Sequence, residues 1–349
     1  MRGLPRVFRA SCIIYPIAAV TRRFKGERIS LPIVKEVTTV ASIAMPVGER
    51  WNVRRCRYAP EAGGAGRLCL ATGMHGDETL GQLIVFGVVS RILREPERLR
   101  GIVDVYPMLN PLGLDIGERM VPSVTRLDMN RAFPGSSDGT ALEGICHSIF
   151  TDMLGADLVL DIHTSTQFKS ELYEARVSAR QADVLLAEAR DLCPELLWVL
   201  PERSDFDASL TGALVAAGTK ALILEADERR RRPQEIADIV VGGIFCKMRQ
   251  MGLWDGDVER QPARDIPCIL GPQDVVRVAC EQPGMYVPND RIGTWVEKGE
   301  QLGVVIDALQ GAILEQVFAP AAGLVFSQRS YSSVYPGTLI ARLCRKERP

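Results

Sequence analysis

The chain has 349 residues, about twice the length of a common single domain, so one large or two unequal domains are expected. Hydrophobic residues make up 46% and charged residues 24%, which excludes a disordered chain and a fibrous one. The 43 acidic and 42 basic side chains nearly cancel, so no global field attracts nucleic acid or an anionic membrane. We expect neither as a partner.

The cysteines and the N-terminus bear on the compartment. Nine cysteines are scattered without a CxxC pair, and their odd number favours free thiols in a reducing compartment. The first 26 residues contain six basic and no acidic residues, as in a targeting peptide, but the Arg22-Arg23 pair fits a cleavage site poorly. No run approaches the roughly 18 apolar residues of a membrane-spanning helix. We expect a cytoplasmic protein with a flexible extension at 1–33, and export is the alternative.

Residues 34–262 alternate short apolar strands with helical patterns. This order indicates an α/β fold, in which a largely parallel, mixed sheet is covered by helices on both faces. The expected strands are Arg67–Ala71, Ile102–Tyr106, Asp157–Ile162 and Lys220–Leu224, and the expected helices are Gly81–Leu93, Ala141–Leu154, Ala179–Leu192 and Gln234–Met251.

Residues 263–349 have a different sequence pattern. Short β-prone runs are separated by turns rich in Gly, Pro, Asn and Asp, and no long helical period remains. The runs are Val275–Ala279, Leu302–Ile306, Gly323–Phe326 and Leu339–Leu343. We expect a small all-β domain here.

Polar residues gather where the predicted strands end. His75 and Glu78 follow the first strand, Asn110 follows the second, and His163 and Glu225 end the third and fourth. Ligands of an open parallel sheet bind outside the carboxyl ends of its strands. We therefore expect these side chains to meet at one edge.

Two histidines and a carboxylate with one open position form a common catalytic zinc set. His75 and Glu78 are three residues apart, so one helical turn places both on one face, and His163 would be the third ligand. Zinc would lower the pKa of its bound water towards ~7. Glu225 could accept that water's proton and pass it to a leaving amine. The alternative is that both histidines are ordinary hydrogen-bonded residues.

Five ordered motifs carry a family resemblance: GMHGDETLGQ, LNPLG, LDMNRAFPG, DIHTS and ILEAD. Together they resemble the succinylglutamate desuccinylase/aspartoacylase family, which belongs to the zinc carboxypeptidase clan. The resemblance covers about residues 40–255. It implies the clan's α/β fold and one zinc ion per chain.

The resemblance also assigns roles to individual residues. It implies that His75, Glu78 and His163 are the zinc ligands and that Glu225 is the catalytic base and acid. Asn130 and Arg131 match the pair that grips the substrate carboxylate, a role that suits the planar guanidinium. Arg119 lies nine residues after Asn110, where the family places the arginine that stabilises the oxyanion. Because the segment after Arg119 is longer than in aspartoacylase, Arg126 competes for that role.

Four further features near these motifs have two interpretations each. Asp161 either orients His163 or bonds to backbone, and Asp128 either braces Arg131 or does not. His147, in a helical run, is expected to have a structural or surface role rather than a catalytic one. The basic run 229–232 either attracts an anionic substrate or is a solvated face.

The C-terminal region resembles the biotinyl/lipoyl-type barrel-sandwich fold in the segments GMYVPNDRIGTWVEKGEQLGVVID, VFAPAAGLVF and PGTLIARL. Carrier domains of that fold present a lysine at a hairpin tip. The corresponding segment here, IDALQGAIL, has none, and Lys298 lies in an earlier turn. We therefore expect a region that shapes substrate access or oligomerisation.

These observations predict a zinc-dependent hydrolase that cleaves an amide bond in a small, carboxylate-bearing substrate. An N-acyl amino acid deacylase fits best, and cleavage of short peptides is the alternative within the same chemistry. A non-catalytic protein that binds a small acid is the alternative from another class. A homo-oligomer is expected from the family, without a subunit number.

Overall fold

The computed structural model describes residues 33–45, 48–64, 66–122, 126–165, 168–202, 204–227, 232–258 and 268–346. These residues belong to one compact unit, Pro32–Pro349. The predicted extension at 1–33 lies outside the described residues, except for Ile33.

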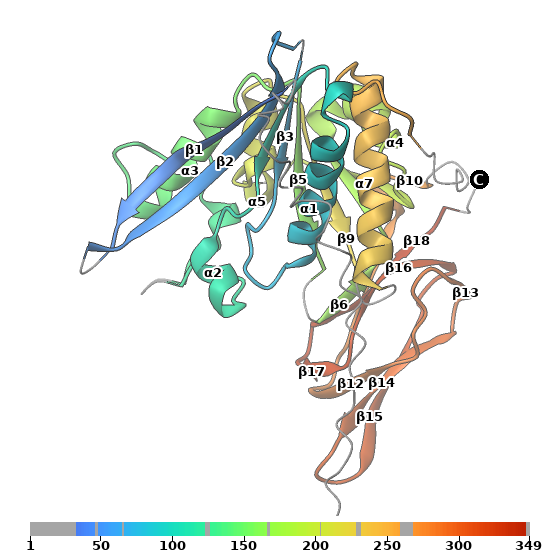
Figure 1. Ribbon diagram of the computed structural model, residues 1–349. Helices are drawn as coiled ribbons and strands as arrows, with labels where there is room; N and C mark the ends of the chain where they lie inside the picture. Colours follow the sequence, from blue (N-terminus) through green and yellow to red (C-terminus); the bar gives the residue numbers. More distant parts are fainter. Residues whose placement is uncertain are drawn as a thin grey trace, which may run out of the picture. The chain divides into compact units, whose positions relative to one another are not determined.

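A nine-stranded mixed sheet is the centre of the fold (Figure 1). Its inner strands β4, β3, β5 and β9 are parallel, as predicted, and β7, β8 and β10 form a second parallel group that runs antiparallel to β9. In spatial order the strands are β1 (Ile33–Ala44), β2 (Arg50–Pro60), β4 (Ile102–Tyr106), β3 (Arg67–Ala71), β5 (Leu158–Thr164), β9 (Ala221–Ala226), β7 (Glu174–Ser178), β8 (Leu196–Leu200) and β10 (Cys268–Leu270).

Helices cover both faces of this sheet, which explains why all seven residues of β5 are buried. On one face α1 (Leu80–Arg94) and α7 (Pro233–Gln250) lie side by side (Figure 1). Lys247 of α7 is ion-paired with Glu188 of α4 (Ala182–Arg190), which packs beside it. The other face carries α3 (Ala141–Met153) and α6 (Leu210–Ala216). The predicted α/β architecture is confirmed.

The predicted elements differ from the observed ones mainly at their ends. The helix expected from Ala179 begins as a 3₁₀ turn, Ala179–Gln181, and only then continues as α4. The other short elements are α2 (Pro111–Ile116), α5 (Ser204–Asp207) and the 3₁₀ turns Pro96–Arg98, Met129–Arg131 and Pro272–Asp274.

The C-terminal region forms two small antiparallel sheets, which confirms its β character. The turn between β14 and β15, residues 308–311, carries no lysine. One sheet contains β11 (Val275–Ala279), β18 (Leu339–Cys344), β16 (Gly323–Arg329) and β13 (Trp295–Val296), and the other contains β15 (Ala312–Phe318), β14 (Gln301–Asp307), β12 (Gly284–Pro288) and β17 (Ser332–Val334).

Strand pairing crosses the predicted boundary at residue 262 in both directions. The short strand β6 (Lys169–Glu171) pairs with β16 of the C-terminal region, and β10 pairs with β8 of the large sheet. These two pairings bring the C-terminal region against the part of the chain that carries the predicted site.

Two further observations concern the chain as a whole. No helix in the described ranges is both long and apolar enough to cross a bilayer. No disulfide joins any two of the eight cysteines within these ranges.

Candidate metal centre and catalytic site

His75 and Glu78 lie in a tight loop between β3 and α1. The loop packs so closely on α2 that a side-chain carbon at Gly76 would lie 2.0 Å from the carbonyl carbon of Gly113. The Gly76 amide also donates to the carbonyl of Glu118, at 3.0 Å. Glycine is therefore required at position 76, and the loop holds His75 and Glu78 on one side of it.

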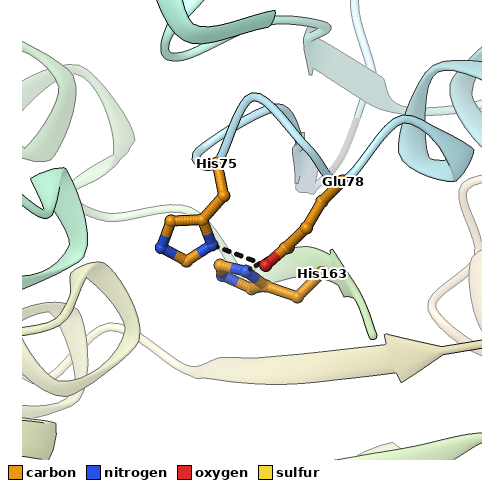
Figure 2. Close-up of side chains that lie close together, drawn as sticks. All are labelled: His75, Glu78 and His163. Atoms are coloured by element: carbon orange, nitrogen blue, oxygen red, sulfur yellow. Dashed lines mark hydrogen bonds and ion pairs between the residues drawn. The ribbon is translucent and has the colours of Figure 1, made fainter. Parts of the chain in front are cut away.

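Three buried side chains converge at this loop, as Figure 2 shows. Nδ1 of His75 lies 2.8 Å from Oε1 of Glu78, and Nδ1 of His163, from β5, lies 2.9 Å from Oε2. One ligand atom from each residue lies within 4.8 Å of the other two. The predicted set is therefore brought together with its donor atoms facing one another, and it could hold a metal ion.

The second nitrogen of each imidazole faces another carboxylate. Nε2 of His75 lies 3.1 Å from Oδ1 of Asp128, and Nε2 of His163 lies 3.2 Å from Oδ1 of Asp161. Carboxylates commonly orient metal-binding histidines in this way. Of the two interpretations of Asp161, the structure therefore shows the contact with His163.

The two histidines keep Glu78 ionised. Burial alone favours its neutral form, but His163 and His75 hold the pKa of Glu78 well below its usual value. An anionic carboxylate beside two imidazoles is the donor set that zinc prefers in catalytic sites with an open position.

Strand register explains the position of Glu225. His163 of β5 is paired with Glu225 of β9, and Glu225 is paired with Glu174 of β7. Side chains of paired residues on neighbouring strands lie on the same face. Glu225 therefore lies on the same face of the sheet as the imidazole of His163.

Glu225 is buried and held by an arginine. Nη1 of Arg176 donates to Oε1 of Glu225 at 2.7 Å. Burial raises the pKa of Glu225, and Arg176 partly opposes this shift. The neighbouring Glu174 is also buried, which raises its pKa to about 7, again against the effect of Arg176.

The two candidate oxyanion arginines lie in different places. Nη1 of Arg119 donates to Oε1 of Glu78 at 2.8 Å, and Arg119 lines the cavity of the site. Arg126 is exposed and pairs with Glu118 instead. The structure therefore brings Arg119 to the metal ligands.

Asn130 and Arg131 belong to the 3₁₀ turn Met129–Arg131, and both line the cavity. Oδ1 of Asn130 accepts from the amide of Leu210 at 3.0 Å, and Nδ2 lies 3.5 Å from Nε2 of His163. Arg131 donates to the carbonyl of Asn130 at 2.6 Å. Asp128, the suggested brace for Arg131, instead contacts His75, Arg119 and the amide of Asn130.

These residues surround a cavity of about 560 Å³. Its wall includes Arg277 and Arg342 from the C-terminal region. The basic side chains of the wall are Arg119, Arg131, Lys169, Arg176, Arg277 and Arg342, and its acidic side chains are Glu78 and Glu225.

Some predicted residues lie elsewhere. Asn110 caps α2, where its side chain accepts from the amide of Gly113 at 2.9 Å, and it does not reach the cavity wall. His147 lies on α3, away from the cavity. Of the basic run, residues 229–231 lie outside the described ranges, and Arg232 is the residue before α7.

Arg176, Trp198, Arg277 and Arg342 belong to the cavity wall but were not predicted from the sequence. The first two lie on β7, a five-residue run of mixed polarity, and on β8, a five-residue apolar run, and neither run carries a motif. The sequence EARVS alternates, so Glu174 and Arg176, two residues apart, are expected on one face of a strand. This alternation is the signal that could have indicated Arg176.

The chain is similar to known proteins over most of its length. The profile of the family described as "Succinylglutamate desuccinylase/Aspartoacylase catalytic domain" matches residues 65–249. A curated relative, the N-alpha-acetyl-L-2,4-diaminobutyric acid deacetylase of Halomonas elongata, is 32% identical in an alignment of 333 positions that covers 90% of this chain and 89% of the relative.

Two solved structures share the fold. A succinylglutamate desuccinylase/aspartoacylase from Rhodobacter sphaeroides gives a TM-score of 0.74 at 21% identity, covering 92% of this chain and 99% of that one. The product-bound ectoine utilization protein EutE (DoeB) from Ruegeria pomeroyi gives 0.74 at 20% identity, covering 91% and 99%.

Proposed function

Because the chain belongs to the succinylglutamate desuccinylase/aspartoacylase family, we propose that it is a zinc-dependent hydrolase of a small N-acyl amino acid. One observation carries the proposal. The buried set His75, Glu78 and His163 opens into a cavity whose wall also holds a buried carboxylate, Glu225, on the adjacent strand.

Zinc fits the donor set. Two imidazole Nδ1 atoms and one carboxylate oxygen face one another, and both rings are braced by carboxylates on the far side. When bound, the ion would supply a Lewis acid for the substrate carbonyl and would make a nearby water more acidic. One ion per chain is proposed.

The chain's own residues would complete the reaction. Glu225 would take a proton from the attacking water and deliver it to the leaving amine nitrogen as the C–N bond breaks, so water is added across the amide. Arg119 would donate to the carbonyl oxygen as negative charge develops there. Asn130 and Arg131 would hold the substrate carboxylate, for which a guanidinium fork is suited.

The charge of the cavity supports a substrate with a carboxylate. Its wall carries six basic side chains and two acidic ones. The curated relative is named for an N-acetylated diamino acid, and the family for succinylglutamate and aspartate derivatives. These three classes are the first substrates to test, and N-acetylated dipeptides would represent the carboxypeptidase-like alternative.

We also propose a cytoplasmic location and a homo-oligomer. The lack of a disulfide between any two of the described cysteines fits a reducing compartment. Size-exclusion chromatography with light scattering would measure the oligomeric state, and a monomer would contradict that part of the proposal.

The test compares wild type with Glu225→Gln on N-acetyl-diaminobutyrate, N-acetylaspartate and N-succinylglutamate, measuring the released amino acid by mass spectrometry. We expect the variant to keep its zinc and to lose about 10²–10⁴-fold in kcat, because glutamine cannot accept the proton. Full hydrolysis by Glu225→Gln would refute the mechanism. Tight binding without hydrolysis by wild type would favour the non-catalytic alternative.

A further inference from the structure

We propose that Arg176 is a positioning residue that holds the carboxylate of Glu225 in place for proton transfer. The inference rests on the proposed function, since Glu225 is the base there. It concerns a residue on β7, a strand that brings no other group to the reacting atoms.

Arg176 reaches three glutamates at once. Its Nη1 donates to Oε1 of Glu225 at 2.7 Å, and its Nε donates to Oε1 of Glu174 at 2.6 Å. Its Nη2 lies 3.4 Å from Oε1 of Glu171. All three nitrogens of the guanidinium therefore have a carboxylate partner, and these contacts fix its orientation within its own plane.

The guanidinium of Arg176 also lies over an aromatic ring. Arg176 is the register partner of Trp198 on β8, and its guanidinium carbon lies 5.3 Å from the centre of that ring. Arg342, from the C-terminal region, lies 5.4 Å from the same ring and 3.4 Å from Oε1 of Glu171. The C-terminal region therefore contributes a second arginine that contacts both Trp198 and Glu171.

Strand register directs Arg176 towards Glu225. Glu174 is paired with Glu225, and Arg176 is paired with Ile223, the residue two positions earlier on β9. Positions 223 and 225 lie on one face, as do 174 and 176. Arg176 and Glu225 therefore lie on the same face of the sheet, in adjacent pairs of the register. The side chain of Arg176 reaches the Glu225 carboxylate along this face.

The alternative role for an arginine in the cavity wall is to bind the substrate carboxylate. Arg176 would have to give up contacts with buried carboxylates to do so, and an uncompensated buried charge is costly. Arg131 and Arg277 are exposed members of the same wall and need not break such a set. The contacts therefore favour the positioning role.

The experiment uses full-length Arg176→Ala and Arg176→Lys, with Arg180→Met as the matched control. Arg180 follows the same strand but is paired with Glu202 and Asp207, away from Glu225. We expect Arg176→Ala to lose about 10²-fold in kcat with KM changed less than about threefold, because a misplaced base costs turnover rather than binding. Added guanidinium should restore part of kcat, Lys should be intermediate, and Arg180→Met should match wild type.

Three results would overturn the proposal. A raised KM with unchanged kcat would make Arg176 a substrate-binding residue. A loss of zinc or of thermal stability together with activity, without recovery in guanidinium, would make it structural. A crystal structure of Arg176→Ala with the Glu225 carboxylate unmoved would exclude positioning directly.

The crystal structure also separates this proposal from the proposed function. If wild type hydrolyses no N-acyl amino acid, the function fails, but the place of Glu225 in Arg176→Ala still decides what Arg176 does. A Glu225 that leaves its wild-type place would support the positioning role in either case.

Discussion

Each histidine of the candidate metal centre lies between two carboxylates. Its Nδ1 faces Glu78, and its Nε2 faces Asp128 for one ring and Asp161 for the other. For His75, a proton on Nε2 is stabilised by Asp128, which leaves the lone pair of Nδ1 free for a metal. For His163, Asp161 places its negative charge beside the ring. Both carboxylates thus lie next to the candidate ligands without being ligands themselves.

We expect Asp161→Asn to weaken zinc binding by about 10–100-fold, because the orienting charge behind His163 is lost. The fold should persist, since Thr211 can keep its hydrogen bond to position 161, now 3.1 Å long. Competition with a chromophoric chelator measures the affinity. Asp138→Asn, in an exposed loop, is the control, and an Asp161→Asn affinity equal to that control would contradict the role.

Side chains at the ends of parallel strands could be predicted from the sequence, but Arg176 could not. His163 and Glu225 lie near the ends of strands that are rich in apolar residues. Both strands, and the edge of the sheet that the two side chains share, can therefore be predicted from the sequence. Arg176 lies on an inserted strand that runs antiparallel to β9, and its approach to Glu225 depends on register. Register is set by tertiary pairing rather than by a local motif.

At the scale of elements, Asp104 joins three strands of the sheet. This fully buried carboxylate of β4 accepts from Arg57 of β2 at 2.8 Å and from Arg67 of β3 at 2.7 Å. Burial favours its neutral form, but the two arginines hold the pKa of Asp104 below its usual 3.8. The edge hairpin β1–β2 is attached to the parallel strands at this point.

Asp104→Asn is expected to lower the free energy of unfolding by about 2–3 kcal/mol near pH 6, since it removes the charge to which two partly buried arginines donate. The folded pKa is below the unfolded one, so the stability from Asp104 is fully present above the unfolded pKa and is lost as pH falls. The difference from wild type should therefore stay constant from pH 6 to 5 and shrink below about pH 4. Urea denaturation across this range measures it, and a difference independent of pH would contradict the assignment.

The strands that could not be predicted share a physical reason. β1 and β2 have an exposed side, with Val34 and Val37 about half accessible, so polar and apolar residues mix without a clear period. The role of Asn110, at the end of a helix, could not be predicted from the sequence either. Its position after β4 predicted a site residue, and its nearer partner, the Gly113 amide, makes it a cap instead.

At the scale of the whole molecule, the C-terminal region helps to build the cavity. Arg277 and Arg342 line it, and β6 joins the C-terminal sheet while β10 joins the large one. The change from alternating strands and helices to short β-prone runs near residue 262 was predicted from the sequence. The pairing of β6 and β10 across this boundary was not, because three-residue strands such as β6 carry no pattern of their own. The division at 262 therefore stays a prediction, while the wall of the cavity contains residues from both sides of it.

The central claim is that His75, Glu78 and His163 hold one zinc ion. The most direct test is the zinc content per chain, by elemental mass spectrometry, of wild type, His163→Ala and the control His147→Ala, all purified without added metal. We predict about one zinc in wild type and in His147→Ala, and none in His163→Ala. Equal zinc in all three, or none in wild type after zinc is offered, would contradict the account.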